Sequence, residues 1–204
     1  MEFKNILFDF GGVIQELNIE RCVQNFVRLG LPSNFFEGRF WDVEILKRMD
    51  RGTATEDEFY DEMRRIGNIP EATNEEILEA WNSLLSGIKK PVVSALKELK
   101  KRYPLYILSN SNIMHWRICH EKLMWFEGED IFKWFRQSFA SFEMHLEKPE
   151  PAIFERVIQQ TGIKAEETLF IDDLAENLEG AAAVGFQTLL TKNGDWIKVL
   201  TGKS

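Results

Sequence analysis

The sequence predicts an α/β fold, in which a doubly wound, Rossmann-like parallel sheet carries an inserted helical cap subdomain. Short apolar segments that end in glycine or in polar residues alternate with helical segments over much of the chain, as in crossover connections between parallel strands. The stretch between residues 18 and 85 interrupts this alternation, because its apolar residues recur only at helical spacing. A chain of 204 residues, 44% of them hydrophobic, can bury a sizeable core without disulfides.

The first predicted strand covers residues 3–8 and is closed by glycines. Helices are expected to follow, one of them begun by a capping box of Thr55 and Glu58. We place the helical cap at residues 17–87 and the Rossmann-like core at 1–16 and 88–204. In the second part of the core we expect helices at 92–103, 151–161, 174–184 and 196–200, and strands at 105–108, 138–141, 169–171 and 187–190.

The composition limits the partners and the compartment. The net charge is −8, from 25 Lys and Arg against 33 Asp and Glu, which argues against binding to a nucleic-acid backbone. Cys22 and Cys119 form no CxxC pair, so we expect free, buried thiols in a reducing compartment. No apolar run reaches the roughly 18 residues that span a bilayer. The expectation is a soluble, cytoplasmic protein without a membrane or nucleic-acid partner.

Polar residues gather where the predicted strands end. Parallel sheets bind ligands at the carboxyl ends of their strands. Carboxylates that meet there repel one another unless a cation neutralises them, and oxygen ligands suit Mg²⁺. A lysine, a serine hydroxyl and main-chain N–H groups would stabilise a phosphate, which an aspartate could attack at phosphorus. The residues concerned are Asp9, Ser109, Asn110, Lys148, Asp172 and Asp173.

These motifs resemble those of the haloacid dehalogenase superfamily of hydrolases. The resemblance spans nearly the whole chain and rests on the order and spacing of four motifs, each weak alone. It is strongest for the subgroup of sugar-1-phosphate phosphatases and the N-terminal phosphatase domain of soluble epoxide hydrolases. The motifs are Asp-Phe-Gly-Gly-Val from Asp9, Leu-Ser-Asn ending at Asn110, Lys-Pro at Lys148, and Asp-Asp at Asp172 and Asp173.

The resemblance implies a Mg²⁺ cofactor and a set of metal ligands. Asp9 would be both the nucleophile and a ligand, and Gly11 would bind the metal through its main-chain carbonyl. Asp173 would be a direct ligand, with Asp172 in support. Asn177, four residues after Asp173, would order the metal loop, although a plain helix-face position is an equal interpretation.

The resemblance also implies how a phosphate is held and cleaved. Ser109 and Asn110 would hold the phosphoryl oxygens, and Lys148 would bridge the nucleophile and the transferred phosphate. The implied activity is Mg²⁺-dependent hydrolysis of a small phosphorylated metabolite, such as a sugar phosphate, through an aspartyl-phosphate on Asp9. With Mg²⁺ bound, the charges of three aspartates and one lysine sum to −3 + 1 + 2 = 0, so that an acidic protein can accept an anion.

One position departs from the family pattern. Most of its phosphatases carry a second aspartate two residues after the nucleophile, where this chain has Gly11. General acid–base help is typically worth roughly 10²–10⁴-fold in rate. Three interpretations are open: a substrate with a good leaving group, a substitute carboxylate from the cap or from Glu16, or a weakly active or non-catalytic phospholigand-binding protein. Dehalogenation needs no metal, and the retained Asp172 and Asp173 disfavour it.

Aromatic residues offer weaker signals. Segment 114–135 is rich in tryptophan and histidine, and it could stack on a substrate or form a homodimer contact, although buried packing is the commoner reason for such a cluster. Cap residues set substrate specificity in the family that this sequence resembles. The candidates there are Phe35, Phe36, Phe40 and Trp41, which amphipathic packing also explains.

Overall fold

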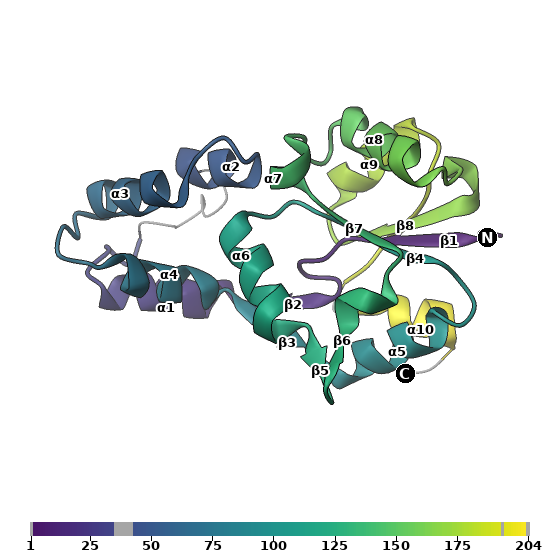
Figure 1. Cartoon of the computed structure of the whole chain (residues 1–204), viewed down its shortest axis with the longest axis horizontal. Helices are drawn as coiled ribbons and strands as arrows, with labels where there is room; N and C mark the ends of the chain where they lie inside the picture. The colour runs from purple at the N-terminus through teal and green to yellow at the C-terminus, as the bar shows by residue number, and fades with distance from the viewer. Residues whose placement is uncertain (1, 35–42, 193, 203–204) are drawn as a thin grey trace.

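The computed structural model describes residues 2–34, 43–192 and 194–202. Its core is a five-stranded parallel sheet (Figure 1). In spatial order the strands are β7 (Gln137–Ala140), β4 (Leu105–Ser109), β1 (Asn5–Phe8), β8 (Thr168–Asp172) and β9 (Gln187–Leu190). The chain runs outward from β1 through β4 to β7, then returns to β8 and β9 on the other side. The predicted doubly wound α/β fold is confirmed.

The register brings the carboxyl ends of three central strands to one edge. Phe8, the last residue of β1, lies opposite Ile107 of β4 and Ile171 of β8. The order of strands reverses between β1 and β8, and ligands in such sheets bind at this switch point. Residues that follow β1, β4 and β8 therefore face a common site.

Helices cover both faces of the sheet and form a hydrophobic core on each face. Alternate residues of β1 pack into these two cores. Ile6 and Phe8 belong to the larger core, whereas Leu7 belongs to the smaller one. Trp196 is fully buried in the larger core, with its ring centroid 5.1 Å from that of Phe8. One face carries α5 (Lys90–Leu99) and α10 (Trp196–Thr201), and the other carries α8 (Pro151–Thr161) and α9 (Ala175–Ala183) (Figure 1).

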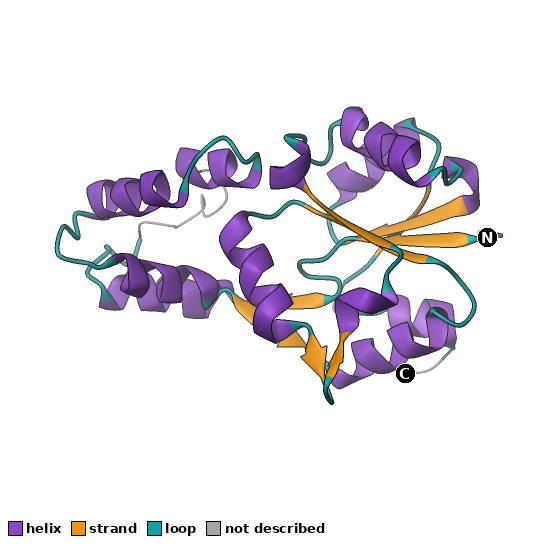
Figure 2. Ribbon diagram, viewed as in Figure 1, coloured by secondary structure: helices purple, strands orange, loops and turns teal. Residues whose placement is uncertain are grey.

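The expected insertion is helical in its described part. Figure 2 shows its helices gathered at one end of the molecule, away from most of the strands. They are α1 (Ile19–Arg28), α2 (Glu44–Asp50), α3 (Glu56–Gly67) and α4 (Asn74–Asn82). The capping box of Thr55 and Glu58 is confirmed, and a second one, of Thr73 and Glu76, begins α4. The limits 17–87 stay a prediction.

A small antiparallel pair joins the cap to the core, and the sequence did not predict it. Its strands are β2 (Gln15–Leu17) and β3 (Leu85–Ile88), with Gln15 opposite Ile88. The pair lies where the chain leaves the core and where it returns. A three-residue strand has too short a pattern to be recognised in a sequence.

Other boundaries shift by a few residues. The helix expected at 92–103 ends at Leu99, and the strand expected at 138–141 is β7, after which Ser141 begins α7 (Ser141–Met144). Segment 113–134 contains α6 (Ile113–Ile118), a π-helix (Cys119–Leu123), the hairpin β5 (Trp125–Phe126) and β6 (Glu129–Asp130), and a 3₁₀ helix (Ile131–Trp134). A further 3₁₀ helix covers Ala165–Glu167.

Two expectations about the chain as a whole can be compared with the structure. Cys22 and Cys119 are free and buried, as expected, and burial raises the pKa of each thiol to about 12. Within the described residues, none of the helices has the length and apolar character to cross a membrane.

Candidate active site

Asp9 and Asp172 lie side by side at the carboxyl edge of the sheet. Asp9 directly follows β1, and its main-chain N–H donates to the carbonyl of Ile171 at 2.8 Å. Asp172 is the last residue of β8. Both are buried, Asp172 completely. Two carboxylates that are this close and this dry require positive charge beside them.

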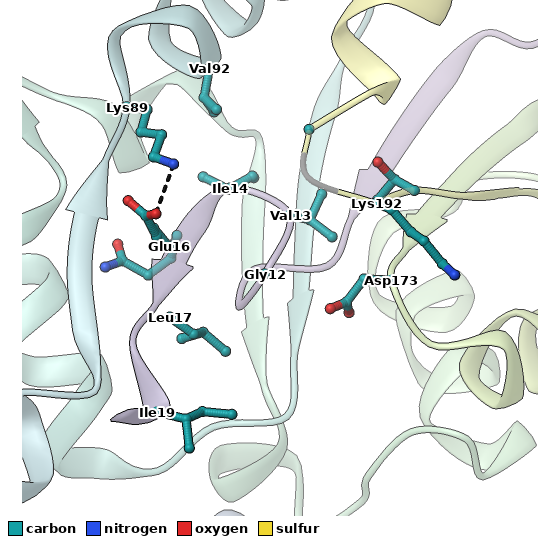
Figure 3. Close-up of a pocket in the computed structure, with 13 residues that line it drawn as sticks. Gly12, Val13, Ile14, Glu16, Leu17, Ile19, Lys89, Val92, Asp173 and Lys192 are labelled. Atoms are coloured by element: carbon teal, nitrogen blue, oxygen red, sulfur yellow. Dashed lines mark ion pairs between the residues drawn. The ribbon is translucent and has the colours of Figure 1, made fainter. Parts of the chain in front are cut away.

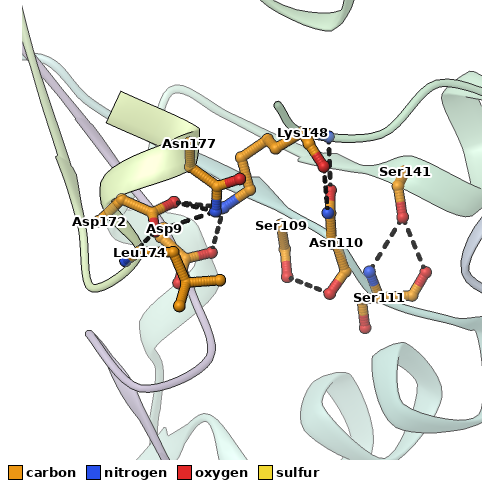
Figure 4. Close-up of polar contacts among 9 residues, drawn as sticks. All are labelled: Asp9, Ser109, Asn110, Ser111, Ser141, Lys148, Asp172, Leu174 and Asn177. Carbon is orange, nitrogen blue, oxygen red and sulfur yellow. Dashed lines mark hydrogen bonds and ion pairs between the residues drawn. The ribbon is translucent and has the colours of Figure 1, made fainter. Parts of the chain in front are cut away.

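Lys148 provides that charge. Its ammonium lies 2.5 Å from Oδ1 of Asp9 and 2.7 Å from Oδ2 of Asp172. Figure 4 shows its side chain reaching between the two carboxylates from the segment before α8. The lysine is itself buried. The carboxylates raise the pKa of Lys148, against the effect of burial, so the ammonium stays charged.

Further donors hold Asp172 in place. The Asn177 amide donates to both of its carboxylate oxygens at 3.0 Å, and the main-chain N–H of Leu174 donates to Oδ1 at 2.9 Å. Asn177 is buried at the start of α9. It therefore orders the loop after β8, as one of the two interpretations of the sequence expected, and it does not lie on a solvated helix face.

Asp173 completes a cluster of three carboxylates. One ligand oxygen from each of Asp9, Asp172 and Asp173 can be chosen so that all lie within 4.8 Å of one another. Among the described residues, this is the group of acidic, cysteine or histidine side chains that could hold a metal ion. Gly12, at φ +82°, lets the turn after Asp9 approach Asp173, since a Cβ there would lie 2.5 Å from Oδ2 of Asp173.

The electrostatics of the cluster favour a further cation. Burial raises the pKa of Asp9 to about 7, although the charge of Lys148 opposes this shift. Burial and the neighbouring Asp172 also raise the pKa of Asp173. Without a metal, three carboxylates and one ammonium carry a formal charge of −2. A divalent cation would neutralise this charge and keep the carboxylates ionised.

The residues at the end of β4 are placed differently from one another. Ser109 is buried, and within the described part of the chain its hydroxyl makes only a long contact of 3.4 Å, to the carbonyl of Asn110. The Asn110 side chain exchanges two hydrogen bonds of 2.9 Å with the main chain of Lys148 (Figure 4). Asn110 therefore positions the loop of Lys148, and its contact with a phosphate stays a prediction.

Gly11 lies in a tight turn between Asp9 and β2. The main-chain N–H of Gln15 donates to the carbonyl of Phe10, and the N–H of Gly12 donates to the carbonyl of Gln15, both at 2.8 Å. Neither bond uses the carbonyl of Gly11. Of the substitute carboxylates considered for this position, Glu16 is exposed on β2 and pairs with Lys89 at 2.7 Å.

The aromatic segment is mostly packing. Trp116 is buried against Phe10 and Phe132, with ring centroids 5.6 and 5.3 Å away. His115 stacks on Trp81, and burial lowers its pKa to about 4, so the core interpretation holds for both. Trp125 is exceptional, because it is 47% exposed. The predicted specificity residues Phe35, Phe36, Phe40 and Trp41 lie outside the described residues.

Comparison with known proteins decides the family. The model of the haloacid dehalogenase-like hydrolases matches residues 3–185. The chain belongs to this family. Over 204 residues it is 31% identical to a D-ribitol-5-phosphate phosphatase of Bacteroides thetaiotaomicron, covering 97% of each protein. The resemblance found in the sequence is thereby confirmed.

Solved structures of this haloacid dehalogenase-like family agree with the fold. One from Bacteroides thetaiotaomicron, in complex with magnesium and inorganic phosphate, superimposes with a TM-score of 0.87 at 34% identity, over 94% of this chain and 96% of the other. A predicted hydrolase of the family from Porphyromonas gingivalis gives 0.88 at 30%, over 99% and 98%. The expectations of a phosphatase and of Mg²⁺ agree with these relatives.

Proposed function

We propose that the protein is a Mg²⁺-dependent phosphomonoesterase that works through an aspartyl-phosphate and acts on a small sugar or polyol phosphate. The observation that carries the proposal is the junction of Asp9, Lys148, Asp172 and Asp173 at the switch point of the sheet. A phosphatase activity of this protein accords with its family. It also accords with the relative that is named a D-ribitol-5-phosphate phosphatase.

The residues present fit a magnesium ion. Their carboxylate oxygens lie close enough to share one ion, and Mg²⁺ prefers such oxygen ligands. Asp9 and Asp173 would bind it directly, with the Gly11 carbonyl. Asp172 would act mainly through Lys148, since both of its oxygens already accept hydrogen bonds. Bound Mg²⁺ supplies Lewis-acid stabilisation of phosphoryl charge and orients the ester.

Asp9 would attack phosphorus with a carboxylate oxygen. The bond from phosphorus to the ester oxygen then breaks, leaving an acyl phosphate on Asp9 and an alkoxide that takes up a proton from water. Lys148 would stabilise negative charge on both the nucleophile and the phosphoryl group, and the Ser109 hydroxyl would donate to a phosphoryl oxygen. Water then attacks the acyl phosphate, which releases phosphate and restores Asp9.

The space beside the cluster supports a small substrate. A cavity of about 470 Å³ opens next to Gly12 and Asp173, with Lys192 on the same side (Figure 3). The pair of Glu16 and Lys89 lies across the cavity. This volume lies within the range of roughly 300–1,000 Å³ for small-molecule sites, and Lys192 among its lining residues favours an anion.

Two alternatives rest on specific observations. Gly11 provides no side-chain acid, which would suit a phospholigand-binding protein with little turnover. Two measurements distinguish an enzyme from a binding protein: hydrolysis of p-nitrophenyl phosphate and D-ribitol 5-phosphate, and binding of inorganic phosphate. Phosphate binding without turnover of either ester would favour the binding protein. Dehalogenation would need no metal, and the cluster of three carboxylates, which could hold a metal ion, argues against it.

Magnesium is expected to stabilise the protein in a pH-dependent way. In metal-free protein the pKa of Asp9 is raised to about 7, so its protonation stabilises the fold at low pH, and this contribution is lost as the pH rises through 7. Mg²⁺ binds the ionised form. The increase in melting temperature on adding Mg²⁺ should therefore be larger at pH 8 than at pH 5.5.

Differential scanning calorimetry with Mg²⁺ or EDTA at the two pH values measures this. Asp173→Asn should lose most of the Mg²⁺ shift, and Asp57→Asn, on the exposed side of α3, should keep it. Equal shifts at pH 5.5 and pH 8 would contradict the prediction, as would a full shift in Asp173→Asn.

Gly180 brings α9 against the loop of Lys148. A Cβ on it would lie 2.1 Å from the carbonyl oxygen of Pro149, so Gly180→Ala must displace backbone. We expect the free energy of unfolding to fall by about 1–3 kcal/mol, and hydrolysis of p-nitrophenyl phosphate to fall as Lys148 moves. Urea unfolding and steady-state kinetics measure both effects.

A matched control separates displacement from a general loss of stability. Ala182→Gly, on the exposed side of the same helix, should cost about 1 kcal/mol through helix propensity and leave the activity unchanged. If both variants lose the same activity, or if Gly180→Ala is fully active, the close approach to Pro149 does not matter for Lys148.

A further inference from the structure

Gln15 is a buried amide without a partner. The residue is 1% exposed, yet among the described residues neither Oε1 nor Nε2 of Gln15 has a hydrogen-bond partner. Buried polar groups in proteins are nearly always paired. A buried amide that has no partner in the described part of the chain is therefore available to hydrogen-bond a ligand.

The main chain fixes Gln15 relative to the proposed nucleophile. Its N–H and its carbonyl are bonded to Phe10 and Gly12, which flank Gly11 in the turn after Asp9. The strand β2 alternates, so that Gln15 is buried and Glu16 is exposed. The main chain that carries the amide is therefore fixed beside the turn that leads from Asp9.

Gln15 is a lining residue of two cavities. One is the cavity of about 470 Å³ beside Asp173. The other, of about 60 Å³, lies between core and cap, and its polar walls include Gln15, Asp50 and Asn112, together with Gly11 and Ser109. If the phosphate of an ester is held near Ser109, the alcohol part of that ester would extend toward these walls.

Asp50 belongs to the cap, and Asn112 belongs to the core. The Asn112 amide donates to Oδ1 of Asp50 at 3.1 Å, while its own oxygen accepts from the main-chain N–H of His115 at 3.1 Å. The Ser141 hydroxyl donates a hydrogen bond to the main-chain carbonyl of Asp50 at 2.6 Å. Asp50 is thus anchored across the boundary, and burial raises the pKa of its carboxyl to about 7.

These groups match the hydrogen-bonding needs of an alcohol. An amide offers two donors and an acceptor, and a carboxylate accepts, whereas each hydroxyl both donates and accepts. We propose that Gln15, with Asp50 and Asn112, forms the subsite that recognises hydroxyl groups on the leaving alcohol of the substrate. The inference rests on the proposed phosphatase function and narrows its substrates to polyhydroxylated alkyl phosphates.

The consequence is selectivity against esters that lack hydroxyls. Such an ester would cover the buried amide of Gln15 without forming a hydrogen bond to it. Sites that hydrogen-bond a substrate hydroxyl discriminate strongly against substrates that lack this hydroxyl. The unpartnered amide also costs the fold free energy, because burial removes its hydrogen bonds to water and no partner among the described residues replaces them. Removing the amide should therefore leave the protein as stable or make it more stable.

The test compares Gln15→Met, which keeps the length of the side chain, with the wild type on three esters. They are D-ribitol 5-phosphate, pentyl phosphate, which has the same carbon chain without hydroxyls, and p-nitrophenyl phosphate. We expect kcat/KM for D-ribitol 5-phosphate to fall roughly 10–100-fold, and kcat/KM for the other two to change less than about twofold. The melting temperature in EDTA should not fall.

Gln159→Met, on the exposed side of α8, is the control and should change nothing. A uniform loss on all three esters, no change on any, or a marked fall in melting temperature would each overturn the subsite. Gln15→Glu, which keeps hydrogen-bonding oxygens, should recover part of the preference for D-ribitol 5-phosphate. If wild-type protein hydrolyses none of the esters, the proposed function itself fails; if it hydrolyses p-nitrophenyl phosphate while Gln15→Met keeps the wild-type preference, only the subsite fails.

Discussion

Replacing Asp9 with asparagine is expected to abolish hydrolysis of every phosphate ester. An amide has nearly the same volume as the carboxylate but cannot form the acyl phosphate, so no covalent intermediate arises. Loss of a nucleophile typically costs several orders of magnitude, and we expect kcat to fall about 10⁴-fold or more. Steady-state hydrolysis of p-nitrophenyl phosphate with Mg²⁺ measures it.

Two comparisons make the result specific. Asp57→Asn makes the same chemical change on the exposed surface of the cap and should keep wild-type activity. Asp9→Asn should remain folded, because the substitution removes a buried charge that is costly without a metal. Activity that survives in well-folded Asp9→Asn would remove Asp9 from the role of nucleophile.

Lys148→Met should damage both stability and activity. The lysine side chain is only 2% exposed and contacts two buried carboxylates. Removing one partner of such a group leaves uncompensated charge, which typically costs about 3–5 kcal/mol. We expect this loss in the free energy of unfolding in EDTA at pH 8, and a fall in kcat of roughly 10²–10³-fold, as for the loss of one transition-state donor.

The stability loss should depend on the conditions. At pH 6 it should be smaller, because Asp9, whose pKa is already raised to about 7, can take up a proton instead. Mg²⁺ should restore part of the stability by supplying charge at the same carboxylates. Lys164→Met, at an exposed lysine, is the matched control. A loss in Lys148→Met that is the same at both pH values, with and without Mg²⁺, would contradict this account.

Most residues of the proposed chemistry were predictable because they lie at the end of a strand or directly after it. Asp9, Ser109 and Asp172 come directly at the ends of short apolar segments, and parallel strands bring such ends to one edge. Lys148 follows no strand of the described sheet directly, and its inclusion depended on the Lys-Pro motif of the family. Its position between Asp9 and Asp172 is a tertiary fact.

Other residues of the site carried weaker signals. Gly180 interrupts a predicted helix, and an isolated glycine there lowers helix stability by about 1 kcal/mol, so a packing reason could have been suspected. Gln15 has no such signal, because one glutamine in a three-residue strand resembles any polar residue. Its burial depends on β3, which follows the whole cap in the sequence.

The sequence by itself determined the fold class, the family and the acidic cluster, since these depend on local periodicity and on the order of motifs along the chain. Only the tertiary structure decided that Asn110 holds the main chain of Lys148, that Glu16 pairs with Lys89 outside the cluster, and that the Gln15 amide is buried without a partner. The physical reason is that hydrogen-bond pairing and burial depend on segments distant in the chain, whose approach no local pattern encodes.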